Sequence, residues 1–71
     1  MSMEGARRII LAQIEAKKSL AKGLECDAKA REAMIRGDTG AADSWFQASA
    51  IWWGIESTYE NIAKAEETIN V

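Results

Sequence analysis

The chain has 71 residues, a net charge of −2 and a hydrophobic share of 48%, which together are typical of one small soluble domain. Cys26 is the only cysteine and histidine is absent, so an intramolecular disulfide and a zinc site built from Cys and His are both excluded. A domain this small buries only about 60% of its unfolded surface, so we expect self-association or partner binding to stabilise it.

The sequence also indicates a location. No apolar run approaches the ~20 residues that span a bilayer, and the first ten residues lack the apolar segment and cleavage site of a secretory signal. A single cysteine suits a reducing cytosol better than an export route. We therefore expect a cytoplasmic protein that makes no membrane contact.

The first predicted element is a helix over about residues 3–36. Proline is absent, and Ala, Glu, Lys, Ile and Leu dominate the composition, which favours helix. Ser2 is suited to cap the start of this helix. Gly23 is its weak point, because an interior glycine costs about 1 kcal/mol relative to alanine. A break near Gly23, which would give three helices, is the alternative.

The turn predicted over residues 37–40 contains the only cluster of helix-breaking residues, Gly37-Asp38-Thr39-Gly40. Gly37 suits the left-handed position after a helix end, and Asp38 or Thr39 can cap the next helix. A second helix is predicted over about residues 40–69, and each helix would run roughly 45–50 Å. The sequence thus predicts an all-α fold, an antiparallel two-helix hairpin that forms a single domain over residues 1–71.

One stretch, GDTGAADSWFQASA, resembles the turn and second helix of a tetratricopeptide repeat at Gly37, Asp38, Ala42 and Phe46. The resemblance covers a single half-repeat, because residues 23–36 lack the large apolar residues that the first helix of the repeat needs. We interpret it as the shared physics of a helix-turn-helix rather than as membership of the repeat family.

Each predicted helix carries an apolar stripe at helical spacing. The main stripe of the first helix consists of Met3, Ala6, Ile10, Ile14, Ala21, Leu24, Ala28 and Ile35. The main stripe of the second helix consists of Ala41, Trp45, Ala48, Trp52, Ile55, Tyr59, Ile62 and Ile69. Across the hairpin, large indoles on the second helix would oppose small residues such as Ala28 and Ala33. We therefore expect Trp45 and Trp52 to lie in the core.

A second apolar face of the second helix contains Ala42, Phe46 and Trp53, and it cannot contact the first helix at the same time as the main stripe does. Beside the main stripe of the first helix, a shoulder is formed by Ile9, Ala16, Leu20 and Met34. Because a two-helix hairpin has no third element to bury this surface, we expect it to meet a second copy or another protein. The expected partner-binding residues are Phe46, Trp53, Ser49, Glu56, Glu60, Leu20 and Met34.

The two halves of the chain differ in charge. Residues 1–37 carry a net charge of +3 and residues 38–71 a net charge of −5. This asymmetry favours packing of the first helix against the second, within one molecule or between copies. We expect Lys17 to lie opposite Glu56 and Glu60, and Glu66 to lie within reach of Arg7, as ion pairs that fix the register.

The basic residues of the first helix do not predict a nucleic-acid-binding stripe. Three i,i+4 pairs in the favourable order, which make this face a salt-bridged, solvated surface, are Glu4–Arg8, Glu25–Lys29 and Glu32–Arg36. A nucleic-acid binder usually has a strong positive excess on one face. We therefore expect no direct binding of nucleic acid.

The sequence lacks the residues of the common catalytic sites. Without histidine, the commonest general base and the Ser–His and Cys–His nucleophile pairs are excluded. Cys26 is expected on the polar side of the first helix, and no glycine-rich loop precedes a helix to bind phosphate. We expect no enzyme activity, no cofactor and no metal site.

These features predict a non-enzymatic interaction module that dimerises into a four-helix bundle and binds a protein partner through its aromatic helix face. By analogy with other small, chemically bare proteins, it would act as an adaptor or as an inhibitor that occludes a larger protein. One alternative is an acidic helix that mimics nucleic acid within a nucleic-acid-handling complex. Another is a helical bundle that holds a small ligand. The sequence does not distinguish a homodimer from a heteromeric interface at the aromatic face.

Overall fold

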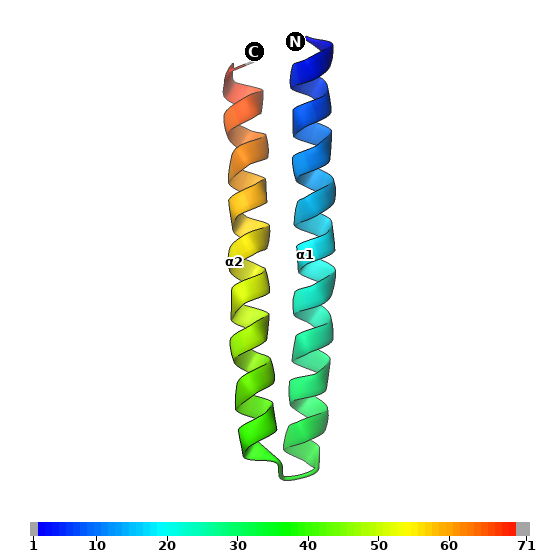
Figure 1. Cartoon of the computed structure of the whole chain (residues 1–71), viewed down its shortest axis with the longest axis vertical. Coiled ribbons are helices and arrows are strands. Elements are labelled where there is room, and N and C mark those ends of the chain that lie inside the picture. Colours follow the sequence, from blue (N-terminus) through cyan, green and yellow to red (C-terminus); the bar gives the residue numbers. More distant parts are fainter. Residues whose placement is uncertain (1, 70–71) are drawn as a thin grey trace.

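The computed structural model describes residues 2–69 and shows two long helices that lie side by side (Figure 1). Helix α1 spans Met3–Ile35, helix α2 spans Thr39–Ile69, and a short turn joins them. The helices run antiparallel, so the start of α1 and the end of α2 lie together at the end opposite the turn (Figure 1). The all-α hairpin predicted from the sequence is confirmed, and α1 passes through Gly23 without a break.

Local capping interactions fix the ends of both helices. The Ser2 hydroxyl accepts a hydrogen bond from the backbone N–H of Gly5 at 3.0 Å, and the Asp38 carboxylate accepts one from the backbone N–H of Ala41 at 3.0 Å. Gly37 has a φ of 76°, a left-handed conformation in which a side chain would be strained. The backbone N–H groups of Gly37 and Asp38 donate to the last turn of α1. The helix ends therefore follow from the local signals in the sequence.

The two helices meet along a seam whose α1 side consists mostly of small residues. Buried residues of α1 recur at alternating steps of three and four, as in a coiled coil. They are Gly5, Ile9, Ala12, Ala16, Ser19, Gly23, Cys26, Ala30 and Ala33. Seam positions of α2 with the same spacing, all buried or half-buried, are Ala42, Trp45, Ser49, Trp52, Glu56, Tyr59, Ala63 and Glu66. Among residues 2–69, Ile9 is the only large aliphatic residue that is buried. The seam thus brings the helices close but covers little large apolar side-chain surface.

The prediction that the aliphatic stripe of α1 faces α2 is wrong. Ile10, Leu24 and Ile35 are 54%, 55% and 87% exposed. That side of the helix is interrupted by Lys17 and Arg31, whose charges would lose hydration in a seam between two helices. The small-residue seam of α1 contains no charged residue. The helices therefore pack through the seam and leave the larger side chains outside.

Trp45 and Trp52 are half-buried, so the prediction that they form a core is only partly right. The Lys29 ammonium lies 4.7 Å from the centroid of the Trp45 ring, which is a cation–π contact. The Cβ of Trp52 would lie 3.6 Å from a Cβ built on Gly23. Trp52 therefore does pack opposite a small residue, as predicted. That residue is Gly23, whereas the predicted Ala28 is exposed.

Two further predictions about α1 are wrong. Cys26, expected on the polar side, is buried because it falls on the three-and-four spacing of the seam. Glu66 forms an ion pair with Arg8, at 3.1 Å, rather than with Arg7. Arg8 directly precedes the seam residue Ile9 and flanks the seam, whereas Arg7 lies on the outer surface of the helix.

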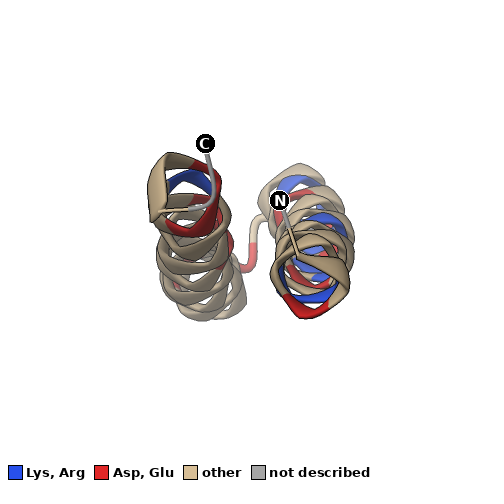
Figure 2. Cartoon of the chain, turned by 90° about the horizontal axis from the view of Figure 1, so that it is seen from above, with Lys and Arg blue, Asp and Glu red and all other residues tan. Residues whose placement is uncertain are grey.

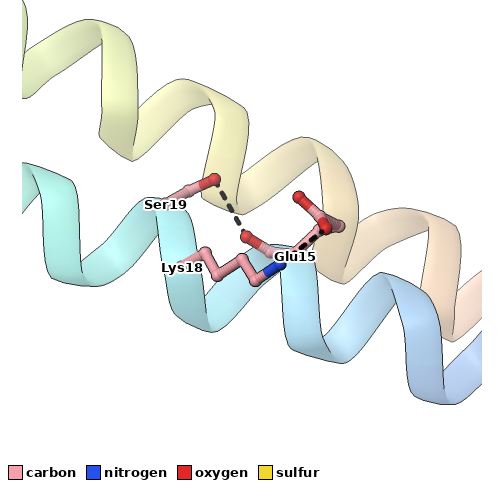
Figure 3. A network of polar contacts seen from close by, with 3 residues as sticks. All are labelled: Glu15, Lys18 and Ser19. Atoms are coloured by element: carbon pink, nitrogen blue, oxygen red, sulfur yellow. Dashed lines mark hydrogen bonds and ion pairs between the residues drawn. The ribbon is translucent and has the colours of Figure 1, made fainter.

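Ion pairs on the solvent side of α1 join residues three apart. The Lys18 ammonium lies 3.4 Å from the Glu15 carboxylate, and the Glu15 carbonyl accepts a hydrogen bond from the Ser19 hydroxyl at 3.0 Å (Figure 3). The Lys22 ammonium lies 3.8 Å from the Glu25 carboxylate. Glu25 therefore pairs with Lys22 in the preceding turn and does not form the predicted ion pair with Lys29.

Candidate protein-interaction surface

One side of the hairpin carries large apolar side chains from both helices. Phe46 and Trp53 are one heptad apart on α2, and Leu20 and Met34 are two heptads apart on α1, so each pair shares a helix face. Met34 and Phe46 line the same open groove near the turn. The two pairs therefore lie on the same side. We name this side the aromatic face, and its residues are Leu20, Met34, Phe46, Trp53, Glu56 and Glu60.

The apolar residues of the aromatic face differ in exposure. Met34 and Phe46 are 57% and 42% exposed. Trp53 is half-buried because its indole covers Gly23, where the Trp53 Cε2 would lie 3.3 Å from an added Cβ. Trp53 thus packs on α1, whereas Met34 and Phe46 project into solvent, so the expectation that this face of α2 cannot contact α1 is wrong at Trp53. Ala42, Ile9 and Ala16, which were expected on the same outward surface, are buried in the seam.

Farther from the turn, the aromatic face continues into an open groove of about 470 Å³ between the helices. The buried seam residues Ala16 and Ala63 form its floor. Lys17, Glu56 and Glu60 also line it. Lys17 therefore lines the same groove as the two carboxylates, as predicted, but among residues 2–69 it does not form the predicted ion pair with them.

Glu56 and Glu60 interact directly within this groove. A side-chain hydrogen bond with Glu60, together with partial burial and the charge of Glu60, raises the pKa of Glu56 above its ordinary value of 4.5. Glu56 therefore keeps its proton to a higher pH than an isolated glutamate does. When both are ionised, they give this end of the aromatic face a negative charge.

Ser49 is the exception among the expected contact residues. It is 3% exposed, and its hydroxyl donates a hydrogen bond to the Asp27 carboxylate at 2.6 Å. Ser49 occupies a seam position, so it joins α2 to α1 and is not accessible to a partner of the intact hairpin. The expectation that it contacts a partner is corrected accordingly.

A second surface, on the other side of the hairpin, was not anticipated. Along α2 an uncharged stripe repeats at steps of three and four: Ala41, Ser44, Ala48, Ile51, Ile55, Thr58, Ile62, Ala65 and Ile69. Ile51 and Ile62 are 65% and 43% exposed. Sequence reasoning assigned Ile55 and Ile62 to the contact with α1. The unbroken spacing and the absence of charge were the signals for a separate stripe.

Lys and Arg lie mostly on α1, whereas Asp and Glu occur on both helices, so α2 has the net negative charge (Figure 2). Within residues 2–69, no three Cys, Asp or Glu side chains gather as metal ligands. Neither described helix has a stretch that is apolar enough to cross a bilayer. The chain matches no protein-family model, no curated protein and no solved structure. The surface of the hairpin is therefore the guide to its function.

Proposed function

We propose that this chain is a non-enzymatic protein–protein interaction module, an adaptor or an inhibitor, whose aromatic face binds another polypeptide. The observation that carries the proposal is the exposure of Met34 and Phe46, at 57% and 42%, from adjacent helices beside the half-buried Trp53. Contiguous exposed apolar side chains with a polar border are typical of protein-binding surfaces. Within residues 2–69, no third helix or strand covers them.

The surface area of the chain supports this proposal. The chain exposes 5095 Å² to solvent. A compact monomer of the same mass would expose about 4400 Å² according to the scaling for folded proteins. The excess of roughly 700 Å² is close to the ~800 Å² that each partner buries in an interface of standard size. Binding through one face would therefore give the hairpin the burial of an ordinary folded domain.

The border of the aromatic face indicates the chemistry of the bound surface. Glu56 and Glu60 place negative charge beside Trp53 and Leu20. A partner surface with apolar side chains and neighbouring Lys or Arg would complement this arrangement, because opposite potentials steer association and select the register. The acidic border thus favours a basic polypeptide surface.

A matched pair of substitutions on α2 tests the proposal. Phe46→Glu introduces a charge into the aromatic face, and Ile51→Glu introduces the same charge at a residue that is 65% exposed on the other side of the hairpin. Tagged forms of both variants and of the wild type are purified from the native host. We expect the Phe46→Glu chain to lose the polypeptides, including other copies of itself, that co-purify with the wild type.

The Ile51→Glu chain should retain these polypeptides, and far-ultraviolet circular dichroism should show that both variants remain helical. The proposal is contradicted if the Phe46→Glu chain retains every polypeptide that the wild type binds. It is also contradicted if only the Ile51→Glu chain loses them.

A further inference from the structure

Contacts between the two helices establish which residues lie at the same level along the hairpin. Ser49 hydrogen-bonds to Asp27 toward the turn, and Glu66 pairs with Arg8 toward the other end. Because both helices rise by the same distance per residue, levels between these contacts follow by interpolation. Every residue of α1 can thus be assigned a counterpart level on α2.

Two symmetric arrangements would cover the aromatic face with a second copy of the chain. When the two-fold axis runs along the hairpin, equivalent residues of the two copies lie at the same height along the axis. Both turns then lie at the same end, and α1 of each copy packs on α2 of the other. A two-fold axis across the hairpin places the turns at opposite ends and lays α1 on α1 and α2 on α2. The charges of the helices distinguish these arrangements.

The arrangement with both turns at the same end brings opposite charges together. It places Lys17 level with the stretch between Glu56 and Glu60 of the other copy. Continued past Asp27 toward the turn, the same register places Arg31 about half a helical turn from the level of Asp43 of the other copy. Within residues 2–69, neither Lys17 nor Arg31 takes part in the ion pairs of the hairpin. The opposite arrangement instead lays α2 on itself, although residues 38–71 carry a net charge of −5. Like charges across an interface oppose association.

Apolar residues complement each other in the same arrangement. Leu20 and the 55% exposed Leu24 of one copy would be level with Trp53 of the other. Met34 and Phe46 both lie near the turn, so the turns must share an end for Met34 of one copy to approach Phe46 of the other. Aliphatic side chains on α1 would therefore cover aromatic rings on α2.

We propose that the aromatic face binds a second copy of this chain, forming an antiparallel four-helix bundle whose two turns lie at the same end. This inference rests on the proposed function, because it names the polypeptide that covers the aromatic face. The opposite charges of the two helices and the excess exposed area support this dimer. The assembled unit is then a dimer in which each α1 lies between its own α2 and that of the other copy.

Distances between spin labels test the arrangement. Cys26 is the only cysteine and is buried, so Cys26→Ala provides a background in which a single cysteine can be labelled. Thr39→Cys places one nitroxide on each chain at the turn. We expect pulsed electron paramagnetic resonance to give a separation well below half of the 53 Å length of the hairpin. A separation close to that full length would overturn the arrangement.

Ser57→Cys provides the matched control for this measurement. Ser57 is exposed and lies near the middle of the hairpin, so labels there come close in either dimer and report dimerisation itself. No dipolar coupling at either position, together with a monomer mass in sedimentation, would overturn the proposal.

A charge exchange tests the same arrangement independently. Arg31 and Asp43 are both exposed, and each belongs to a different helix. Arg31→Asp and Asp43→Arg should each weaken the dimer by about two- to fivefold, as expected for an exposed ion pair. The double variant should recover the wild-type dissociation constant in sedimentation equilibrium. A double variant that is weaker than either single variant contradicts the proposed pairing.

The results separate this inference from the proposed function. The wild type could prove to be a monomer while the Phe46→Glu chain loses another protein in the native host. That result would contradict the dimer but would agree with the proposed function. A wild-type monomer with no polypeptide lost from the Phe46→Glu chain overturns both.

Discussion

Gly23 determines how closely the two helices approach near the middle of the hairpin. A Cβ added at Gly23 would lie 3.3 Å from Trp53 Cε2 and 3.6 Å from Trp52 Cβ. Gly54 differs, since a Cβ added there would have no such neighbour within 4 Å. Gly23 thus matches a packing requirement, whereas Gly54 only weakens the helix that contains it.

The two glycines should therefore respond differently to substitution. Gly54→Ala should raise the free energy of unfolding by about 0.5–1 kcal/mol, because alanine favours helix. Gly23→Ala should gain less, since Trp53 must move, and Gly23→Leu should lose about 1–3 kcal/mol through overpacking. Urea denaturation at a fixed chain concentration measures all three. Equal gains from the two alanine variants would contradict the close contact at Gly23.

Glu56 makes stability depend on pH. Its pKa is raised in the folded state by the hydrogen bond with Glu60, by burial and by the charge of Glu60. A carboxyl group with a raised folded-state pKa binds its proton more tightly when folded, so its contribution to stability improves as the pH falls through the raised pKa toward 4.5. Above that window the ionised group opposes folding.

Glu56→Gln removes this opposition. The variant should have a higher Tm than the wild type at about pH 7, and the difference should shrink as the pH falls through the window above the ordinary carboxyl pKa. Thermal unfolding followed by circular dichroism across this pH range measures the effect. A difference that grows on acidification would contradict the interaction between the two carboxyl groups.

At the scale of the helices, local signals predicted the elements but not the faces they present. Ser2, Gly37 and Asp38 fix the helix ends through short-range bonds that are readable from neighbouring residues. Which face of a helix packs depends on the size and charge of residues along its whole length. Large residues such as Ile10 and Leu24 dominate a hydrophobicity pattern, yet α1 packs on α2 through seam residues that are uncharged and mostly small. Residue size and charge decided the contact.

The candidate site was predicted better than the seam. The heptad spacing of Phe46 and Trp53, and that of Leu20 and Met34, was enough to group these residues by face. Ser49 was misplaced because its role depends on a bond to Asp27, far away in the sequence. No pattern within α2 reveals that bond until the facing residues of the two helices are known.

The bond between Ser49 and Asp27 should contribute to the pairing of the helices. Ser49→Ala should lower the free energy of unfolding by about 1–3 kcal/mol, because a carboxylate then loses a hydrogen-bond donor. Ser57→Ala, at an exposed position of α2, is the control and should change it by less than about 0.5 kcal/mol. Urea denaturation gives both values. Indistinguishable variants would show that this bond does not help to hold the helices together.

At the scale of the whole molecule, the hairpin is long and thin, with extents of 53 × 13 × 11 Å. Ile9 is the only large aliphatic residue buried among residues 2–69, and many larger apolar side chains remain exposed. Hydrophobic burial is the main favourable contribution to folding. A single copy therefore has less of this contribution than a compact domain, and the proposed association through the aromatic face would supply more.

The dependence of Tm on chain concentration shows whether association through the aromatic face stabilises the fold. A fold stabilised by association unfolds at higher temperature as concentration rises, whereas an isolated hairpin unfolds at the same temperature throughout. Over about a hundredfold range of concentration, the Tm of the wild type and of Ile51→Glu should rise, and that of Phe46→Glu should stay constant. A wild-type Tm that does not change with concentration would show that association does not stabilise the fold.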